Sequence, residues 1–552
     1  MGHGYIDSQK ILNEAIGKVL RSWGVEVNGW EVVHPKLEKF GDWTTNAALL
    51  AAKPLGKSPT ELALNLKTDL EKMEEVVKIV DKIETTGPYL NITLKQEMLI
   101  GALQKMEIPQ VGEGKTVVID YSAPNIAKPF GIGHLRSTNI GQALYNLYSV
   151  VGWKCIGDNH LGDWGTQFGK LIVAIEKWGE GDEELTIEKL EKLYVKFHAE
   201  AQIDDTLIER AREKFAALEK GDEEVKKMWQ RCVDISLLEF ERVYKVLGVK
   251  IDYAYGEAFY QPLLNEVIEE VKKKGITTES QGATIVEFTK MPPALLVKSN
   301  GATTYFTRDL ATLKFRKETW NPDLVIYEVG ADQQLHFEQV FETGQMMGWF
   351  DKTQLNHVAH GLIRWADGKF STREGKTIHL MEVIERATEE ALTMAEDKDR
   401  SIAQKVAIGA IKFADLAQDP KKDIIFDWKK IMSLEGNSGP YLMYTVARIN
   451  SLVSKSSQSP NEKVDKPAVE EMSLIRYINQ WPEKVVEASD RLSPAVLAEY
   501  LVETAQKFNE FYNKYRIVGQ PEESWRLYLS LKTAEVIKKG LALLGIETVE
   551  RM

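Results

Sequence analysis

The chain has 552 residues, of which 43% are apolar and 28% are charged, and its formal net charge is -12 at pH 7. This composition is ordinary for a soluble globular protein, and the length predicts roughly three to four domains of ~150 residues each. Two cysteines are too few for a disulfide framework, no run of about 18 apolar residues could cross a membrane, and the N-terminus lacks the apolar core of a secretory signal. We therefore expect a cytoplasmic protein with no membrane contact.

The acidic net charge argues mildly against nucleic-acid binding, because neutralising phosphates favours a basic surface. The 70 lysine and arginine residues are nevertheless enough to form one basic face on a protein of this size. The composition therefore leaves RNA binding open.

The first segment, residues 1 to about 110, mixes helical and strand patterns. It opens with an apolar face at helical spacing, formed by Ile11, Ala15, Val19 and Leu20. Residues 40–59 contain a Gly-Asp turn and then an Ala/Leu run that is ended by a proline and a glycine. Residues 87–94, GPYLNITL, alternate as a strand does. An α+β domain is predicted here.

From about residue 111 to 395, predicted strands alternate with helices, which is typical of βαβ units and a parallel sheet. The strands are expected at residues 115–122, 153–160, 323–330 and 357–363. A long segment, roughly 165–300, separates the second strand from the third. It is rich in lysine and glutamate at helical spacing, and we interpret its charges over 176–230 as solvated helix faces.

The last segment, residues 396–552, is predicted to be mostly helical. It contains few strand candidates, and prolines interrupt its helical runs. Residues 457–467 are polar with two prolines and are expected to form a loop between helices.

Residues 122–138, SAPNIAKPFGIGHLRST, directly follow the first predicted strand. A helix is expected to begin near His134, because apolar residues then recur at helical spacing, at Leu135, Ile140, Leu144 and Leu147. Gly131 and Gly133 remove two side chains where the backbone meets the helix N-terminus, so a phosphate-bearing ligand could come close. By itself this strand–turn–helix pattern is common among α/β proteins.

A second segment, GKFSTREGKT at residues 368–377, makes the interpretation more specific. In this order the two segments resemble the two signatures of class I aminoacyl-tRNA synthetases, and the residues around them resemble those of arginyl-tRNA synthetases. The resemblance covers nearly the whole chain. It implies a Rossmann-type catalytic domain with an inserted connective domain, an α+β N-terminal domain that contacts tRNA, and an all-α C-terminal anticodon-binding domain.

The activity implied by this resemblance is arginine–tRNA ligation. ATP would activate L-arginine as an adenylate, and the arginyl group would pass to the 3′ end of tRNA(Arg), with AMP and pyrophosphate as the other products. Mg²⁺ is expected to be carried with ATP, held mainly through the phosphates, and no dedicated protein metal site is expected. The family also implies a monomer.

The first signature usually reads His-x-Gly-His, and here it reads Gly-Ile-Gly-His. Gly131 therefore stands where a histidine is usual. The resemblance implies that Gly131, Gly133 and His134 contact ATP, and that His134 is the donor that stabilises charge developing on the α-phosphate.

The second signature is usually of the Lys-Met-Ser-Lys type, and here Thr372 stands where the second lysine is usual. The implied ATP contacts are Lys369, Ser371 and Thr372. Cations must still offset the charge on the leaving pyrophosphate, and Lys369 and Arg373 are the expected catalytic cations of this segment. We hypothesise that Lys128 substitutes for the missing lysine.

An arginine substrate presents a planar, permanently charged guanidinium, which carboxylates and carbonyl oxygens hold best. By resemblance, Asp120 and Asn125 are expected to hold its α-amino and carboxyl end. Tyr305 and Asp309, four residues apart and thus on one helical face, are expected to bind the guanidinium. Gln333 is expected near the ammonium or the substrate backbone.

The tRNA evidence lies in the last segment, where residues 434–449 form a tight glycine-containing loop followed by a helix with a proline at its start. Splayed bases of single-stranded RNA stack on aromatic rings and guanidinium planes. The resemblance to anticodon-binding domains implies five tRNA contacts: Tyr441, Tyr444, Arg448, Tyr512 and Met552.

Two alternatives stay open beside the arginine–tRNA ligase. One is another class I aminoacyl-tRNA synthetase. The other is a catalytically weakened tRNA-binding relative, suggested by the missing signature histidine and lysine. The presence of Asp120, Asn125, His134, Tyr305, Asp309 and Gln333 argues against the second, because a decaying enzyme is not expected to keep the pocket.

Overall fold

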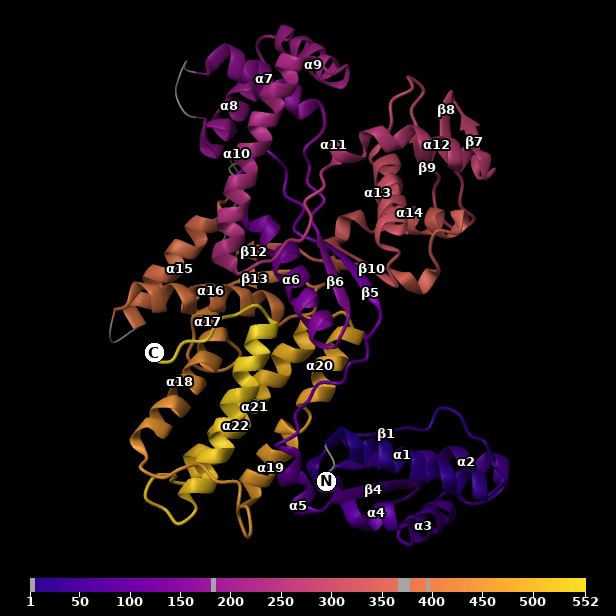
Figure 1. The fold of residues 1–552 in the computed structure, drawn as a ribbon, viewed down its shortest axis with the longest axis vertical. Helices are drawn as coiled ribbons and strands as arrows, with labels where there is room; N and C mark the ends of the chain where they lie inside the picture. The colour runs from indigo at the N-terminus through magenta and orange to yellow at the C-terminus, as the bar shows by residue number, and fades with distance from the viewer. Residues whose placement is uncertain (1–4, 180–184, 366–377, 395–397) are drawn as a thin grey trace.

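The computed structural model describes residues 5–179, 185–365, 378–394 and 398–552. A parallel sheet lies in the middle of the elongated molecule (Figure 1). The segment inserted into this sheet extends to one end, and the N-terminal domain and the C-terminal helices lie beside each other at the other end.

The central sheet has four parallel strands in the order β11-β10-β5-β6. Their bounds are Thr116–Asp120 for β5, Lys154–Asp158 for β6, Leu324–Gly330 for β10 and Leu355–His360 for β11. From β5 the chain passes first to β6 on one side and later to β10 on the other. The carboxyl end of β5 is therefore a topological switch point, where Rossmann-type sheets bind nucleotides. The predicted parallel sheet is confirmed.

Helix α6 (Leu135–Val150) follows β5 and is buried along most of its length, which confirms the predicted apolar helix. Gly141 explains how closely it lies on the sheet. A Cβ atom added at Gly141 would stand 2.2 Å from the Cβ of Tyr121, so any other residue there would push the helix away. This contact positions the helix N-terminus, with His134, at the end of β5.

The N-terminal domain is a four-stranded antiparallel sheet, order β1-β2-β4-β3, covered by helices, and the α+β prediction is confirmed. Its strands are β1 (Val32–Val33), β2 (Trp43–Thr45), β3 (Val80–Thr86) and β4 (Tyr89–Leu94). Its helices are α1 (Tyr5–Ser22), α2 (Ala47–Leu55), α3 (Pro59–Leu70), α4 (Glu74–Ile79) and α5 (Gln96–Ala102).

The segment inserted between β6 and β10 was expected to be helical, and its first part is. It contains α7 (Thr166–Trp178), α8 (Ile187–Glu200), α9 (Thr206–Glu219), α10 (Glu223–Leu247), α11 (Glu257–Tyr260) and α12 (Leu264–Lys273). Its second part also holds a small antiparallel sheet, which was not predicted: β7 (Thr277–Ser280), β8 (Ala283–Val286) and β9 (Ala294–Val297). These strands have four residues each, too few for a clear alternation. Helices α13 (Tyr305–Trp320) and α14 (Gln334–Met347) then flank β10 in the chain.

The C-terminal region is a helical bundle, as predicted. Its helices are α15 (Leu380–Met394), α16 (Arg400–Leu416), α17 (Trp428–Ile431), α18 (Gly439–Lys455), α19 (Val469–Ile478), α20 (Trp481–Asp490), α21 (Pro494–Lys514) and α22 (Glu523–Leu543). One strand, β13 (Ile424–Phe426), interrupts the expected helical pattern and pairs in parallel with β12 (Ile363–Trp365). A three-residue strand whose partner lies about sixty residues away leaves no periodic signal in the sequence.

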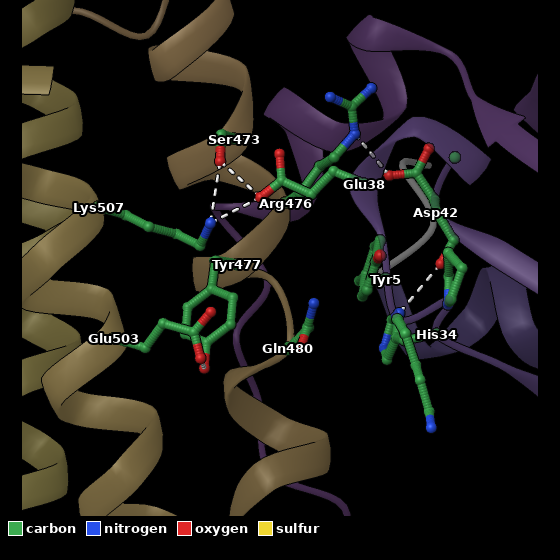
Figure 2. A pocket seen from close by; sticks show the side chains of 13 residues that line it. Tyr5, His34, Glu38, Asp42, Ser473, Arg476, Tyr477, Gln480, Glu503 and Lys507 are labelled. Carbon is green, nitrogen blue, oxygen red and sulfur yellow. Dashed lines mark hydrogen bonds and ion pairs between the residues drawn. The ribbon is translucent and has the colours of Figure 1, made fainter. Parts of the chain in front are cut away.

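Polar side chains join the N-terminal domain to helices α19–α21 around a small pocket (Figure 2). Asp42, in the predicted Gly-Asp turn, accepts a hydrogen bond from Arg476 Nε at 2.9 Å. Its other carboxylate oxygen accepts from the backbone N–H of Leu94 at 2.8 Å. Lys507 donates to Glu38 at 2.6 Å across the same boundary. The two domains therefore meet through directed polar contacts.

Candidate active site

The backbone after β5 adopts an uncommon conformation. Ser122, Ala123 and Ala127 have φ angles of 76°, 43° and 63°. Non-glycine residues rarely occupy this left-handed region, and such backbone strain concentrates at functional sites. The segment 122–138, selected from the sequence by its glycines and proline, is therefore also conformationally unusual.

Surrounding elements hold this strained segment in place. The backbone N–H of Ser122 donates to Ser137 Oγ of α6 at 2.9 Å, and its hydroxyl lies 2.8 Å from the Tyr244 hydroxyl of α10. The N–H of Ala127 donates to Ser236 Oγ, also on α10, at 2.8 Å. The inserted segment thus supports the loop that follows the first strand.

The first signature segment pairs with the residues that directly follow the second. Residues 366–377 lie outside the described residues, and with them Lys369, Ser371, Thr372 and Arg373. The residues directly after this segment pair with the first signature: Ile132 N–H donates to the Ile378 carbonyl at 2.9 Å, and Leu380 N–H donates to the Phe130 carbonyl at 3.0 Å. Residues 378–380, just after the second signature, are therefore anchored beside Gly131.

His134 is half-buried at the end of the short 3₁₀ turn Ile132–His134 that leads into α6. Its Nδ1 accepts a hydrogen bond from the Gly131 N–H at 3.2 Å, so the proton of the neutral ring lies on Nε2. Burial, assisted by the charge of Lys128, lowers the pKa of His134 to about 4. The ring is therefore neutral at pH 7 and offers Nε2–H as a donor.

The space next to His134 is open at Gly133, where an added Cβ would meet nothing within 4 Å. Gly131 is buried and starts the turn. Lys128 is exposed, with its ammonium 5.9 Å from the centre of the Tyr194 ring. An exposed cation, a neutral hydrogen-bond donor and a glycine therefore lie along one short segment.

Asp309 is held between two histidines near the carboxyl end of the sheet. It lies on α13, and its carboxylate is 2.5 Å from His336 Nε2 and 3.8 Å from His160 Nε2. Tyr305, one turn earlier on the same helix, is 61% exposed. The predicted helical relation between Tyr305 and Asp309 is confirmed, while their roles stay predictions.

Asp120, at the last position of β5, is buried and already has a partner. Its Oδ2 accepts a hydrogen bond from Arg316 Nη2 at 2.7 Å, and Arg316 also binds Asp158 of β6 at 2.7 Å. Asn125 and Gln333, the other predicted arginine ligands, are both exposed. Asn125 follows β5 and Gln333 immediately precedes α14, so both stand at the same edge of the sheet.

Two further groups of charged residues at this edge were missed from the sequence. One is Arg316 with Asp158, and the other surrounds Arg308, which lies 3.4 Å from Glu257. Burial raises the pKa of Glu257 to about 7. A signal for Arg316 was present, because it stands seven residues after Asp309 and thus on the same helical face. Glu257 had no such signal, because it follows the inserted helices with no motif around it.

Four of the five predicted tRNA-binding residues, all but Tyr441, lie around an open hollow of about 950 Å³. Tyr444, Arg448, Tyr512 and Met552 line it, and the Arg448 guanidinium lies 4.7 Å and 5.4 Å from the two tyrosine rings. Tyr441 is buried instead, and its hydroxyl accepts a hydrogen bond from Asn509, which also accepts one from Arg448. Tyr441 is therefore linked to Arg448 through Asn509 and does not itself line the hollow.

Within the described ranges, no group of three or more His, Cys, Asp or Glu side chains could hold a metal ion. No helix in this part of the chain is long and apolar enough to span a bilayer.

Comparison with known families gives three matches along the chain. Residues 8–94 match the arginyl tRNA synthetase N terminal domain, residues 96–428 the catalytic domain of tRNA synthetases class I (R), and residues 442–552 the DALR anticodon binding domain. The catalytic-domain match, which ends at residue 428, spans both β12 and β13.

Individual proteins agree with these matches. An arginine–tRNA ligase of Clostridium kluyveri is 40% identical over 99% of this chain and 100% of its own length, and one of Clostridium botulinum is 40% identical over 94% and 95%. The crystal structure of arginyl-tRNA synthetase from Plasmodium falciparum matches with a TM-score of 0.82, 26% identity and full coverage of both chains. The Thermus thermophilus arginyl-tRNA synthetase has the same fold, with a TM-score of 0.84.

A Rossmann-type sheet whose switch point carries the first signature segment, within a matched catalytic domain, defines a class I aminoacyl-tRNA synthetase. The N-terminal and catalytic domain matches and the relatives at 40% identity are all those of the arginine branch of that class. The chain belongs to the arginyl-tRNA synthetase family. The prediction of an arginine–tRNA ligase is confirmed, and the alternative of a different class I synthetase is set aside.

Proposed function

We propose that arginine binds at the carboxyl end of the central sheet, with its guanidinium at Asp309 and its α-ammonium at Asp120. The observation that carries this proposal is the spacing along α13. Asp120 is fixed against Arg316, and Asp309 stands seven residues before Arg316, which corresponds to ~10 Å along a helix axis. Asp309 and the Arg316-bound carboxylate of Asp120 are thus offset along the helix axis, and an extended arginine is proposed to reach from one to the other.

Three other residues complete the proposed arginine site. Tyr305 lies one turn beyond Asp309 on the same helical face and would cover the guanidinium. Asn125 and Gln333, both exposed at the sheet edge, would contact the substrate carboxyl and backbone. None of these exposed groups has to leave a buried partner to do so.

ATP is proposed to bind over Gly131 and Gly133, with its α-phosphate at the Nε2–H of His134. The neutral ring donates this hydrogen bond without first losing or gaining a proton, and charge that develops on the phosphate strengthens it. The proposed ATP site is completed by Lys369, Ser371, Thr372 and Arg373, because the residues that directly follow their segment pair with the loop at Gly131. Mg²⁺ would be carried by the ATP phosphates, with no protein cage required.

The test of this proposal is arginine-dependent exchange of pyrophosphate into ATP by the full-length protein, measured with and without tRNA. If exchange occurs only when arginine is present, the result supports a shared ATP and arginine site. The measurements with and without tRNA show whether arginine activation requires bound tRNA. Exchange that proceeds equally without arginine would overturn it.

Lys128→Ala should lower the rate of this exchange by about tenfold or more, which corresponds to roughly 1.4 kcal/mol of transition-state stabilisation. The reason is that Lys128 would replace the missing signature lysine, and its charge already acts on His134. Lys192→Ala, on the exposed side of α8, is the matched control and should leave the rate unchanged. Wild-type exchange by the Lys128 variant would show that this cation is dispensable.

The hollow around Arg448 is proposed to bind the anticodon stem and loop of tRNA(Arg). Unstacked bases would lie on Tyr444 and Tyr512, with the guanidinium of Arg448 between the two rings. The chain terminus is held at this site, because Asn450 donates to the carbonyl and carboxylate of Glu550. Met552 is thus available as a contact, and Tyr441 would support Arg448 through Asn509.

The remaining assignments are proposals of the same kind. The N-terminal domain, about residues 1–110, would contact tRNA, the catalytic domain would extend over about 111–395 with its insertion at 165–300, and residues 396–552 would form the anticodon-binding domain. We propose a cytoplasmic monomer, consistent with the ordinary composition and the two cysteines.

A further inference from the structure

Three side chains form a row across the sheet where its strands end. Asp120 on β5 is in register with Tyr327 on β10 and with Asp158 on β6. Register partners on neighbouring strands point to the same face of a sheet, so the three side chains lie together. Arg316 of α13 covers the row: its Nη2 is 2.7 Å from Asp120 and from Asp158, and its guanidinium lies 4.9 Å from the Tyr327 ring.

This cluster is deeply buried, with Arg316 and Asp158 at 0% exposure and Asp120 at 6%. Buried ion pairs contribute little net stability, because the loss of hydration offsets their attraction. Two buried atoms, Arg316 Nη1 and Asp158 Oδ1, also have no hydrogen-bond partner among the described residues. Stability alone therefore explains the cluster poorly, while its place beside the proposed α-ammonium position suggests a role in binding.

We propose that Arg316 is a positioning residue for the α-ammonium of the arginine substrate. It holds the Asp120 carboxylate at the strand end, and as one cation between two carboxylates it leaves a single negative charge for the ammonium to neutralise. Arg316 itself, fully buried, does not touch the substrate. The inference rests on the proposed assignment of Asp120 to the α-ammonium.

The arrangement predicts selection for the amino group of the substrate. A site built to pair with a substrate N–H rejects the analogue that lacks it, because buried acceptors are then left without partners. δ-Guanidinovalerate has the guanidinium and carboxylate of arginine but no amino group. Agmatine keeps the amino group and lacks the carboxylate.

The test compares the dissociation constants of these three ligands for the full-length protein, measured by calorimetry, in the wild type and in Arg316→Lys. Lysine keeps the charge but cannot bridge two carboxylates with a planar fork. Arginine and agmatine should both bind about tenfold or more weakly to the variant, whereas δ-guanidinovalerate should change by less than about twofold. A residue that only stabilises the fold would affect the three ligands equally.

Arg136→Lys is the matched control. Like Arg316, Arg136 of α6 is buried, at 1% exposure, and it binds a buried carboxylate, that of Asp415, at 2.9 Å. This substitution should lower the melting temperature without changing the preference for arginine over δ-guanidinovalerate. If both Arg316→Lys and Arg136→Lys lose the preference for arginine over δ-guanidinovalerate, the loss reflects reduced stability, and the proposal is overturned.

The remaining outcomes separate this inference from the proposed site. A wild type that prefers arginine and an Arg316→Lys variant that keeps this preference would overturn the role of Arg316 alone. A wild type without the preference would overturn the Asp120 assignment and this inference with it. Should Arg316→Lys fail to fold, Asp158→Asn decides, because it removes the extra negative charge at nearly constant shape: loss of the preference supports the proposal, and its retention overturns it.

Discussion

Replacing Asp309 by alanine should reduce kcat/KM for arginine by roughly a hundredfold to several thousandfold, while the KM for ATP stays within about twofold. Asp309, whose side chain is only 17% exposed, is proposed to accept hydrogen bonds from the substrate guanidinium. Removing one partner of a mostly buried ion pair leaves the other charge desolvated, at a cost of roughly 3–5 kcal/mol. Steady-state pyrophosphate exchange with varied arginine and varied ATP gives both constants.

The control for this prediction lies on the same helix. Glu318 on α13 is 64% exposed and 3.6 Å from Lys314, so Glu318→Ala removes a carboxylate without touching the proposed pocket. It should leave both constants unchanged. Asp309→Asn, which keeps the shape and loses the charge, should fall nearer to Asp309→Ala than to the wild type. An Asp309→Ala enzyme with the arginine constants of the wild type would remove Asp309 from the site.

Replacing His134 by alanine should slow pyrophosphate exchange by about 10²–10³-fold, the usual effect of losing one preorganised donor to a developing negative charge. The KM for arginine should change little, because His134 is proposed to contact the α-phosphate of ATP and not arginine. His134→Asn and His134→Gln offer shorter or longer amide donors and should recover part of the rate. Full activity in His134→Ala would contradict the assignment.

The pH dependence of stability provides an independent measurement of the same residue. The pKa of His134 is lowered to about 4 in the folded protein from an ordinary value of 6.5. Between these values the unfolded chain binds more protons, so the contribution of His134 to stability is fully present above pH 6.5 and is lost as the pH falls towards 4. The melting temperature of the wild type should therefore decline more steeply in this window than that of His134→Gln. Parallel declines would mean that the ring is already charged in the folded state.

Local patterns in the sequence were sufficient for the elements that build the catalytic domain. The four strands of the parallel sheet and the helix after His134 are long enough for their apolar residues to show periodicity, and glycines and prolines marked their ends. The strands of the small sheet at β7–β9 and the pair β12 and β13 were missed, because three or four residues show no period. Tyr305 and Asp309 were correctly placed on one helical face, because residues four apart in a helix lie on the same side.

The partners of these residues could not be found in this way. Asp120 was expected to hold the α-amino end of the substrate, and the residue that binds its carboxylate, Arg316, lies 196 residues further along the chain. Asp309 is held by His336, and the strained loop at Ser122 and Ala127 is fixed from the distant helix α10. Tyr441, paired with Tyr444 in the sequence, turned inward because the helix buries that side in the bundle.

The sequence by itself determined the order of the domains, the strand–turn–helix that ends at His134, and the kinds of side chain available for ATP, arginine and tRNA. Periodicity and signature spacing are properties of neighbouring residues, so no three-dimensional information is needed to detect them. Only the tertiary structure decided which charges meet. Two carboxylates on neighbouring strands and one arginine on a covering helix become a single cluster through sheet register and helix packing, and these relations join residues that are far apart in the chain.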